Sequence, residues 1–370
     1  MKILIKGGNA LIGSTFELFD ILIDDDLIVK IGKDIQCEDA KVIDATGKYI
    51  APGFIDIHTH CYPIEPLGLD PDVLGIERWA STIVDAGTAG ACNFEDFNKN
   101  YIEKCKTRVY SLLNVSNYGL KFKHELDDLS KIDEKAISDI VKKYPDKIVG
   151  FKARASQSVV NEMGIKPIEM AANIAHENKK PLMVHIGNYP PHLEDVLNCL
   201  DTGDVITHTY HGKAGGILTK DKSAIIDEAL SARNRGVLFD IGHGSASFSF
   251  EVYKKARSLG FNCDLISSDL HVENYNGPVF NMVEVVNKII NCGEPIEDAI
   301  NKCTSVPAMH FGLKQLGELK EGNLGDVFIF KIIDCIEEVI DSIGDKLVLN
   351  KKIKPECLIV SRGEKSGIYQ

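Results

Sequence analysis

The sequence predicts an α/β fold: a (β/α)8 TIM barrel with a small β-sandwich domain formed by both ends of the chain. Residues 51–317 alternate short apolar β-type runs with segments of helical periodicity, and eight such strand candidates occur there. Residues 1–50 and 318–370 lack this alternation and contain β-type runs separated by turn residues. Eight βα units in about 260 residues match the size of a closed (β/α)8 barrel.

The strand candidates are short apolar runs that end in polar residues or glycine, as buried parallel strands do. They cover residues 54–60, 88–94, 109–116, 148–156, 181–188, 205–212, 236–244 and 263–271. Most are separated by helical patterns. In Lys166–Asn178, for example, Pro167 suits the first turn of a helix and apolar residues recur on one face. An open, doubly wound sheet is the structural alternative, but eight units favour a closed barrel.

The two ends of the chain contain only β patterns. Short strands are expected at residues 2–6, 20–23, 27–31, 327–331, 347–349 and 357–360. Since these strands flank the barrel in sequence, the economical arrangement is one small β-domain built from both ends. The predicted domains are therefore 1–50 with 318–370, and a (β/α)8 barrel at 51–317.

The composition limits the classes of partner. Of the 370 residues, 44% are hydrophobic, which is enough for a sizeable core. The formal net charge of −12, without a long basic run, argues against nucleic acid and anionic membranes as partners. No apolar run approaches the length of a membrane span. The sequence leaves the oligomeric state open, a homo-oligomer included.

The first residues and the cysteines indicate the compartment. Met1–Gly8 has the pattern of a short strand and a turn rather than that of a signal peptide. The ten cysteines are scattered, and none forms a Cys-x-x-Cys pair. In a chain without a secretory signal such cysteines are reduced and mostly buried. We therefore expect a cytoplasmic protein.

The segment Pro52–His60 carries the first indication of function. Its apolar β-run ends in His58 and His60, at positions i and i+2. Residues with this spacing point to the same face of a strand, so the two imidazoles would lie side by side, as a chelating pair does. An isolated His-x-His is more often a pair of surface or turn histidines. Here further candidate ligands recur at later strand ends, which favours a metal site.

Further polar residues fall toward the carboxyl ends of predicted strands. They are Lys152 and Arg154 in residues 148–156, His185 in 181–188, His208 in 205–212, and Asp269 and His271 in 263–271. In a (β/α)8 barrel these ends converge on one mouth, where catalytic residues collect. Packing alone explains a single such histidine but not several with an aspartate on one rim. Imidazole and carboxylate ligands without thiolate suit zinc best, with manganese, iron and cobalt as alternatives.

Lys152 interrupts an otherwise apolar strand. A free ammonium buried beside cations is unfavourable, so the sequence allows two interpretations. In the first, Lys152 pairs with a carboxylate and has a structural role. In the second, its amine is deprotonated and modified to an anionic metal ligand.

Five segments together resemble the amidohydrolase superfamily of metal-dependent hydrolases. In order they read PGFIDIHTH, GFKARAS, LMVHIGN, VITHTYHG and LISSDLH. The resemblance covers essentially the whole chain, including the flanking β-domain. It is greatest for the amidohydrolase/deacetylase branch, often described as dihydroorotase-like, which GFKARAS, LFDIGHGSASFSF and SSDLHVENYNGPVF resemble specifically.

This resemblance implies a binuclear metal centre. It implies that Lys152 is N-carboxylated and bridges two divalent ions, for which zinc is the best match. One ion would be completed by His58, His60 and Asp269, and the other by His185 and His208. Asp269 would be the catalytic base, taking a proton from the attacking water and passing it to the leaving group.

Other polar residues are candidates for substrate binding. Arg154 shares a strand face with Lys152, so it could hold a substrate carboxylate or merely balance nearby negative charge. Tyr210 and His211 could polarise the substrate carbonyl or line the pocket. His271, like His243, could support a metal ligand or form the pocket wall. Tyr62 could add an aromatic wall beside the histidine pair.

We expect a cytoplasmic hydrolase that deacylates a small N-acyl or O-acyl carboxylic acid. The alternatives are a cyclic amidase such as dihydroorotase, an amino-purine deaminase, and a non-enzymatic scaffold on the same fold. Scaffold relatives usually lose metal ligands, whereas all six are kept here, and single-metal deaminases of the superfamily lack the lysine. Dihydroorotases place a carboxylate-binding arginine two residues after the second histidine, where this chain has Tyr62.

Overall fold

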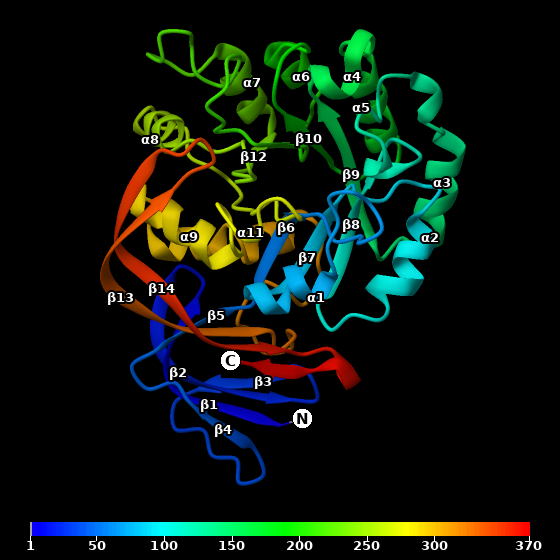
Figure 1. The fold of residues 1–370 in the computed structure, drawn as a ribbon. Coiled ribbons are helices and arrows are strands. Elements are labelled where there is room, and N and C mark those ends of the chain that lie inside the picture. The colour runs from blue at the N-terminus through cyan, green and yellow to red at the C-terminus, as the bar shows by residue number, and fades with distance from the viewer. Residues whose placement is uncertain (1) are drawn as a thin grey trace.

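The computed structural model describes residues 2–370, whose strands form two sheets (Figure 1). In the first sheet the strands pair in the order β12-β11-β10-β9-β8-β7-β6, and every pairing is parallel. They are β6 (Phe54–Thr59), β7 (Ala80–Ala86), β8 (Arg108–Asn114), β9 (Ile148–Ala155), β10 (Leu182–Ile186), β11 (Val205–Thr207) and β12 (Leu238–Phe239). Because neighbours in the sheet are consecutive in sequence, each connection crosses over outside the sheet, as in a βαβ unit.

The segment 265–270 lies between the two edges of the parallel sheet. Leu270 forms a parallel bridge with Thr59 of β6, and Leu265 forms one with Asp240, which follows β12. The segment is not a regular strand, unlike the strand predicted at 263–271. By contacting both edges it completes the curl of the sheet, and the architecture is TIM-barrel-like.

One predicted strand is wrong. Residues 88–93 form a loop, Phe94 begins a helix, and the second strand of the parallel sheet is β7. This strand ends at Ala86, and the next residue, Gly87, has a φ of +80° in the left-handed region. The loop then passes so close to the segment after β8 that a Cβ on Gly90 would lie 2.1 Å from Ser116 O. The apolar residues at 88–93 therefore pack a loop and do not extend the sheet.

Figure 1 shows the helices outside the curled sheet. They are α1 (Pro71–Leu74), α2 (Phe94–Phe97), α3 (Glu134–Lys143), α4 (Gln157–Val160), α5 (Lys166–Glu177), α6 (Leu193–Asn198), α7 (Asp227–Arg235), α8 (Phe250–Ser258), α9 (Met282–Asn291), α10 (Ile296–Asn301) and α11 (Ser305–His310). The helix predicted at Lys166–Asn178 is confirmed as α5, with Pro167 in its first turn and its apolar stripe buried. None of the helices within residues 2–370 has the length and apolar character needed to cross a bilayer.

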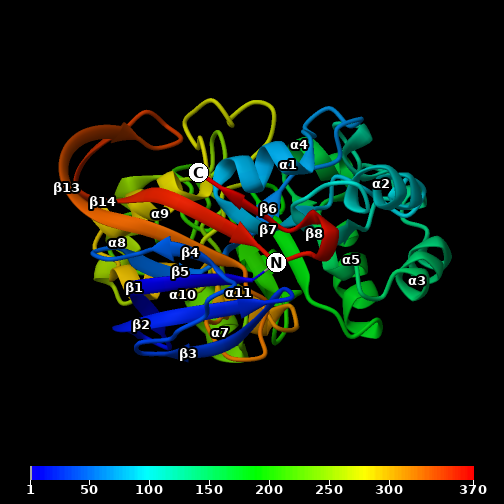
Figure 2. The same cartoon turned by 90° about the horizontal axis from the view of Figure 1, so that it is seen from below.

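The second sheet combines both ends of the chain (Figures 1 and 2). Its order is β15-β14-β13-β5-β1-β2-β3, with β4 paired to β1. The strands are β1 (Ile3–Ile12), β2 (Thr15–Asp24), β3 (Leu27–Gly32), β4 (Lys41–Asp44), β5 (Tyr49–Pro52), β13 (Val327–Ile340), β14 (Lys346–Val360) and β15 (Gly367–Tyr369). Over the described residues this is one mixed sheet and not the predicted sandwich of two. The pair of strands predicted at 347–349 and 357–360 is the single long strand β14.

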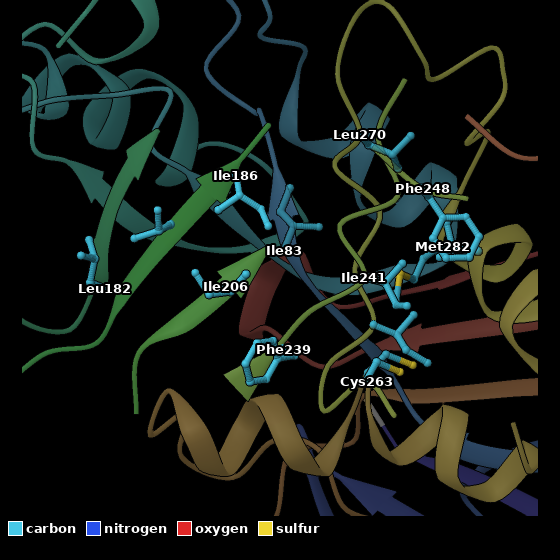
Figure 3. Packing of buried hydrophobic residues seen from close by; sticks show 14 of the residues in the cluster. Ile83, Leu182, Ile186, Ile206, Phe239, Ile241, Phe248, Cys263, Leu270 and Met282 are labelled. Carbon is cyan, nitrogen blue, oxygen red and sulfur yellow. The ribbon is translucent and has the colours of Figure 1, made fainter. Parts of the chain in front are cut away.

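Two apolar cores hold these sheets. Figure 3 shows part of the larger one, in which Ile83, Ile206 and Phe239 of the parallel sheet are all fully buried. Phe239 packs edge-on against Phe261, with ring centroids 4.7 Å apart. A separate core joins Ile5 of β1 and other residues of the first fifty to Ile329 of β13 and neighbouring strands. The rigid parallel sheet leaves its carboxyl-end rim for polar side chains.

Candidate metal centre

The predicted ligands gather where the parallel strands end. His58 lies on β6 and His60 directly follows it, while His208 directly follows β11 and Asp269 lies in the closing segment 265–270. Ligand atoms of His58, His208 and Asp269 all lie within 4.8 Å of one another, and the three residues are buried. The structure therefore brings together segments that are more than 200 residues apart in sequence.

Asp269 is the centre of this cluster. Its Oδ1 lies 3.3 Å from His58 Nε2 and 3.2 Å from His60 Nε2, and its Oδ2 lies 3.9 Å from His208 Nε2. Burial works to raise the pKa of Asp269, but the imidazoles of His58, His271 and His60 hold it well below the usual range. The carboxylate therefore remains an anion that three imidazole nitrogens face.

Hydrogen bonds on the far side of each ring orient the imidazoles. Thr207 Oγ1 donates to Asp240 Oδ2 at 2.7 Å, so it accepts from His58 Nδ1 at 2.9 Å. His208 Nδ1 donates to Gly242 O at 2.6 Å. These bonds place the proton on Nδ1 of both histidines and aim the Nε2 lone pairs at Asp269.

The donor set fits a divalent metal ion. His208 Nε2 is buried and has no hydrogen-bond partner within residues 2–370. A buried lone pair without a partner is costly, and a metal ion would satisfy it. Burial also lowers the pKa of His208 to about 3, so the ring is neutral, as a ligand must be.

Lys152 of β9 reaches the same cluster. It is 1% exposed, and its Nζ lies 2.8 Å from His58 Nε2 and 3.4 Å from Met183 Sδ. It forms no ion pair within residues 2–370, so the carboxylate partner allowed by the first interpretation is not found. Burial lowers the pKa of this amine to about 7, which makes the deprotonated, modifiable form accessible.

His185 of β10 adjoins the cluster without joining its compact part. Its ring lies at 85° to that of His208, with centroids 4.4 Å apart. The ring is half-buried and makes no hydrogen bond within the described residues. A ligand here would meet an imidazole that is not already engaged by the protein.

The backbone at two of these residues is strained. His208 has φ +66° and Asp269 has φ +55°, in the left-handed region that residues other than glycine seldom adopt. His208 directly follows β11, and Asp269 lies in the irregular segment that bridges the two edges of the sheet. Such conformations persist where the surrounding structure enforces them, and they cluster at functional sites.

Three candidate substrate residues turn away from the cluster. Both oxygens of Glu125 accept from Arg154, at 2.5 Å to Nε and 2.5 Å to Nη2, so this fork is not free to hold a substrate. Tyr62 is fully buried and its hydroxyl donates to Asp96 at 2.8 Å, so it does not wall the site. Tyr210 is also fully buried, and its ring packs against Tyr253. The backbone of these three residues lies near the rim, but their side chains point into the protein interior.

The other candidate histidines lie beside the cluster. His271 Nδ1 donates to Asp269 O at 2.6 Å. The ring centroids of His60 and His271 are 5.9 Å apart. His243 is buried and accepts at Nε2 from Lys288 Nζ, 3.0 Å away. His211 is 2% exposed, and its Nδ1 accepts from the backbone N–H of Lys213.

The sequence prediction missed several residues that support the centre. Thr207 and Asp240 orient His58, Glu125 engages Arg154, and Lys213 lies near His185. A weak signal existed for Thr207, because it precedes His208 at the end of a predicted strand. Nothing local marks Glu125, which lies 29 residues before its partner.

Comparisons with known proteins match this arrangement. A model of the amidohydrolase family matches residues 49–354. A protein of Enterococcus faecalis named deacetylase is 38% identical over 362 residues, which are 97% of each chain. A crystal structure described as an adenine deaminase has a TM-score of 0.94 and 36% identity, covering 100% of this chain and 99% of its own.

A second solved structure carries a different name. It is described as a dihydroorotase and has a TM-score of 0.90 and 32% identity. The match covers 97% of this chain and 96% of that one. These similarities and the family match extend over most of the sequence and confirm the resemblance drawn from the five segments. The chain belongs to the amidohydrolase family.

Proposed function

We propose that this protein is a metal-dependent hydrolase that removes the acyl group from a small N-acyl or O-acyl carboxylic acid. The observation that carries the proposal is Asp269, an anionic carboxylate faced by Nε2 of His58, His60 and His208. The similarity to a protein named deacetylase over nearly the full length favours deacylation among the reactions of the family.

The proposed cofactor is a pair of divalent metal ions, with zinc as the best match to these ligands. His58, His60 and Asp269 would hold one ion, His185 and His208 the other, and a carboxylated Lys152 would bridge them. Two observations support this assignment: the buried amine of Lys152 has no carboxylate partner within residues 2–370, and Nε2 of His208 has no hydrogen-bond partner there. When bound, the ions would polarise the acyl carbonyl and lower the pKa of a water molecule toward neutrality.

Asp269 would carry out both proton transfers, and the histidines beside it keep it in place. Asp269 accepts the proton of the water whose oxygen adds to the acyl carbon. When the bond from this carbon to nitrogen or oxygen breaks, Asp269 returns the proton to the departing amine or alcohol. His58 and His208 keep their orientation through Thr207 and Gly242, so the carboxylate meets water in one geometry.

Two alternatives are a cyclic amidase and an amino-purine deaminase, the reactions named for the two similar solved structures. The dihydroorotase reaction is disfavoured at Tyr62. That residue stands where dihydroorotases carry an arginine, and its hydroxyl is already donated to Asp96. The single-metal form of deamination is disfavoured by Lys152, a residue that the superfamily's single-metal deaminases lack.

The proposal extends to architecture and setting. The segment 265–270 would serve as the eighth strand of a closed (β/α)8 barrel. The domains would comprise residues 51–317 for the barrel, and 1–50 with 318–370 for the small β-domain. The protein would act in the cytoplasm on a small-molecule substrate without a nucleic-acid or membrane partner, and a homo-oligomer is compatible with this function.

A substrate panel tests the proposal. Purified protein would be assayed for metal content and for hydrolysis of N-acetyl amino acids and O-acetyl hydroxy acids of both configurations. We expect turnover of at least one member and weak or absent hydrolysis of dihydroorotate. Efficient turnover of dihydroorotate, with kcat/KM of about 10⁴ M⁻¹s⁻¹ or more, would restore the cyclic amidase. Ammonia release from adenine without deacylation would favour the deaminase.

A further inference from the structure

Lys213 brings a positive charge to the edge of the metal centre. It lies in the loop that follows β11, two residues after His211. Its Nζ and the Nε2 of His185 face the same point, the place that a Cβ on Gly187 would occupy. The ammonium is 3.8 Å from that point and the imidazole nitrogen 3.3 Å. The hydroxyl of Ser156 is nearer still, 2.5 Å from that point, and has no hydrogen-bond partner within residues 2–370. Three polar groups therefore converge on the space that Gly187 leaves open.

Three other cations near the metal centre are already engaged. Arg154 is held by Glu125, Lys152 by its contact with His58, and Lys288 by His243 and Pro278 O. By contrast, Lys213 Nζ has no hydrogen bond or ion pair within residues 2–370, and the residue is exposed. Lys213 is therefore free to bind an anion that enters the site.

Lys213 interacts electrostatically with the metal centre. Lys213 is exposed, but partial desolvation of its ammonium lowers its pKa, while the negative charge of Asp269 works to raise it. A cation next to residues that would hold divalent cations is electrostatically unfavourable. An anionic group on the substrate would relieve this repulsion, and a neutral substrate would not.

A cavity of about 690 Å³ continues from Lys213. It is lined by apolar side chains that include Tyr189, Leu218 and Val252, and by polar ones that include His211, Glu194, Lys220 and Lys222. Its volume is in the range of pockets that take small molecules. A substrate anchored near His185 would have room there for an apolar side group.

We propose that Lys213 binds the carboxylate of the acyl substrate, with the substrate's side group in the adjoining cavity. The inference rests on the proposed deacylase function and names the residue that selects acids over neutral acyl compounds. It assigns to Lys213 the role that sequence considerations offered to Arg154. One ion pair at this edge would also fix the distance between the carboxylate and the acyl carbon over Asp269.

Paired substrates and a charge-matched control test this role. Each acid of the N-acetyl and O-acetyl panel would be compared with its primary amide in wild type, Lys213→Met, Lys213→Arg and Lys254→Met. Lys254 is an exposed lysine on α8, so its variant removes the same charge elsewhere. We expect Lys213→Met to raise KM for the acids tenfold or more, with a small change in kcat. Lys213→Arg should restore part of the loss, and the amides and Lys254→Met should show none of it.

A binding measurement separates this inference from the proposed function. In the Asp269→Asn protein, calorimetry would compare the same acids and amides with and without Lys213→Met. Preference for acids that disappears with Lys213 supports the site even if wild type hydrolyses no panel member, an outcome that would defeat only the deacylase. Equal binding of acids and amides, no binding of either, or a KM unaffected by Lys213→Met overturns the role of Lys213.

Discussion

Two flanks of the metal centre differ in how firmly the protein holds their side chains. The held flank consists of His58, Thr207, His208 and Gly242. Here His58 Nδ1 donates to Thr207 Oγ1 at 2.9 Å, and His208 Nδ1 donates to Gly242 O at 2.6 Å. In the open flank, made of His185, Gly187, His211 and Lys213, the ring of His185 and the ammonium of Lys213 have no hydrogen bond within the described residues.

The difference indicates that the two flanks have different roles, one in holding metal and the other in binding substrate. Fixed rings present their lone pairs in one geometry, which favours a permanent ligand such as a metal ion. Unengaged polar groups keep their hydrogen-bonding capacity for a molecule that enters and leaves. Variants of the held flank should therefore affect metal content and chemistry, and variants of the open flank should affect substrate affinity. The following predictions run from the largest expected effect on turnover to the smallest.

Replacing Lys152, which contacts the held flank, should have the largest effect. Lys152→Ala removes the proposed bridging ligand, so we expect loss of most bound metal and nearly all activity, with partial rescue by short-chain carboxylates. Metal analysis and hydrolysis assays would measure both, with Lys254→Ala as the control. A variant that retains two metal ions and normal turnover would show that Lys152 is not a bridge.

Asp269→Asn should separate chemistry from folding. The amide keeps the size of the side chain and one oxygen ligand but cannot accept the proton, so kcat should fall on the order of 10²-fold or more. Circular dichroism should show a folded protein. If turnover stays at the wild-type level with the same metal content, Asp269 is not the base.

Thr207→Val tests the orientation of the held flank directly. It removes the hydroxyl that accepts from His58 Nδ1, and we expect metal affinity to fall about 10- to 100-fold. Chelator competition would measure it. Thr209→Val is the matched control, because the Thr209 hydroxyl is buried and donates to Ile206 O instead of to a histidine. Equal loss of metal in both variants would mean that the effect is general destabilisation.

Arg154→Met should change stability more than turnover. Glu125 is fully buried, so removing its partner leaves an unpaired carboxylate at a cost of about 3–5 kcal/mol in the free energy of unfolding. We expect a lower Tm by calorimetry, KM for acids close to wild type, and recovery of Tm in the double variant with Glu125→Gln. A large rise in KM without a change in Tm would return the carboxylate-binding role to Arg154.

Local pattern in the sequence determined much of this protein. The spacing of His58 and His60 placed both imidazoles on one side of a strand, because side chains alternate along β structure. Apolar periodicity located α5, and most strands of the parallel sheet overlap the runs predicted for them. The return of β patterns after the barrel anticipated that the two ends of the chain share a sheet.

Tertiary structure decided which of the polar residues remain available. The sequence singled out Arg154 and Tyr62 and missed Lys213, but Glu125 and Asp96 engage the first two and nothing within residues 2–370 engages the third. Tertiary structure also decided that Asp269 adopts a left-handed backbone and that residues 88–93 form a loop. These features depend on contacts between segments far apart in the chain, and short-range propensity carries no information about such contacts because their free energy arises only after the segments pack.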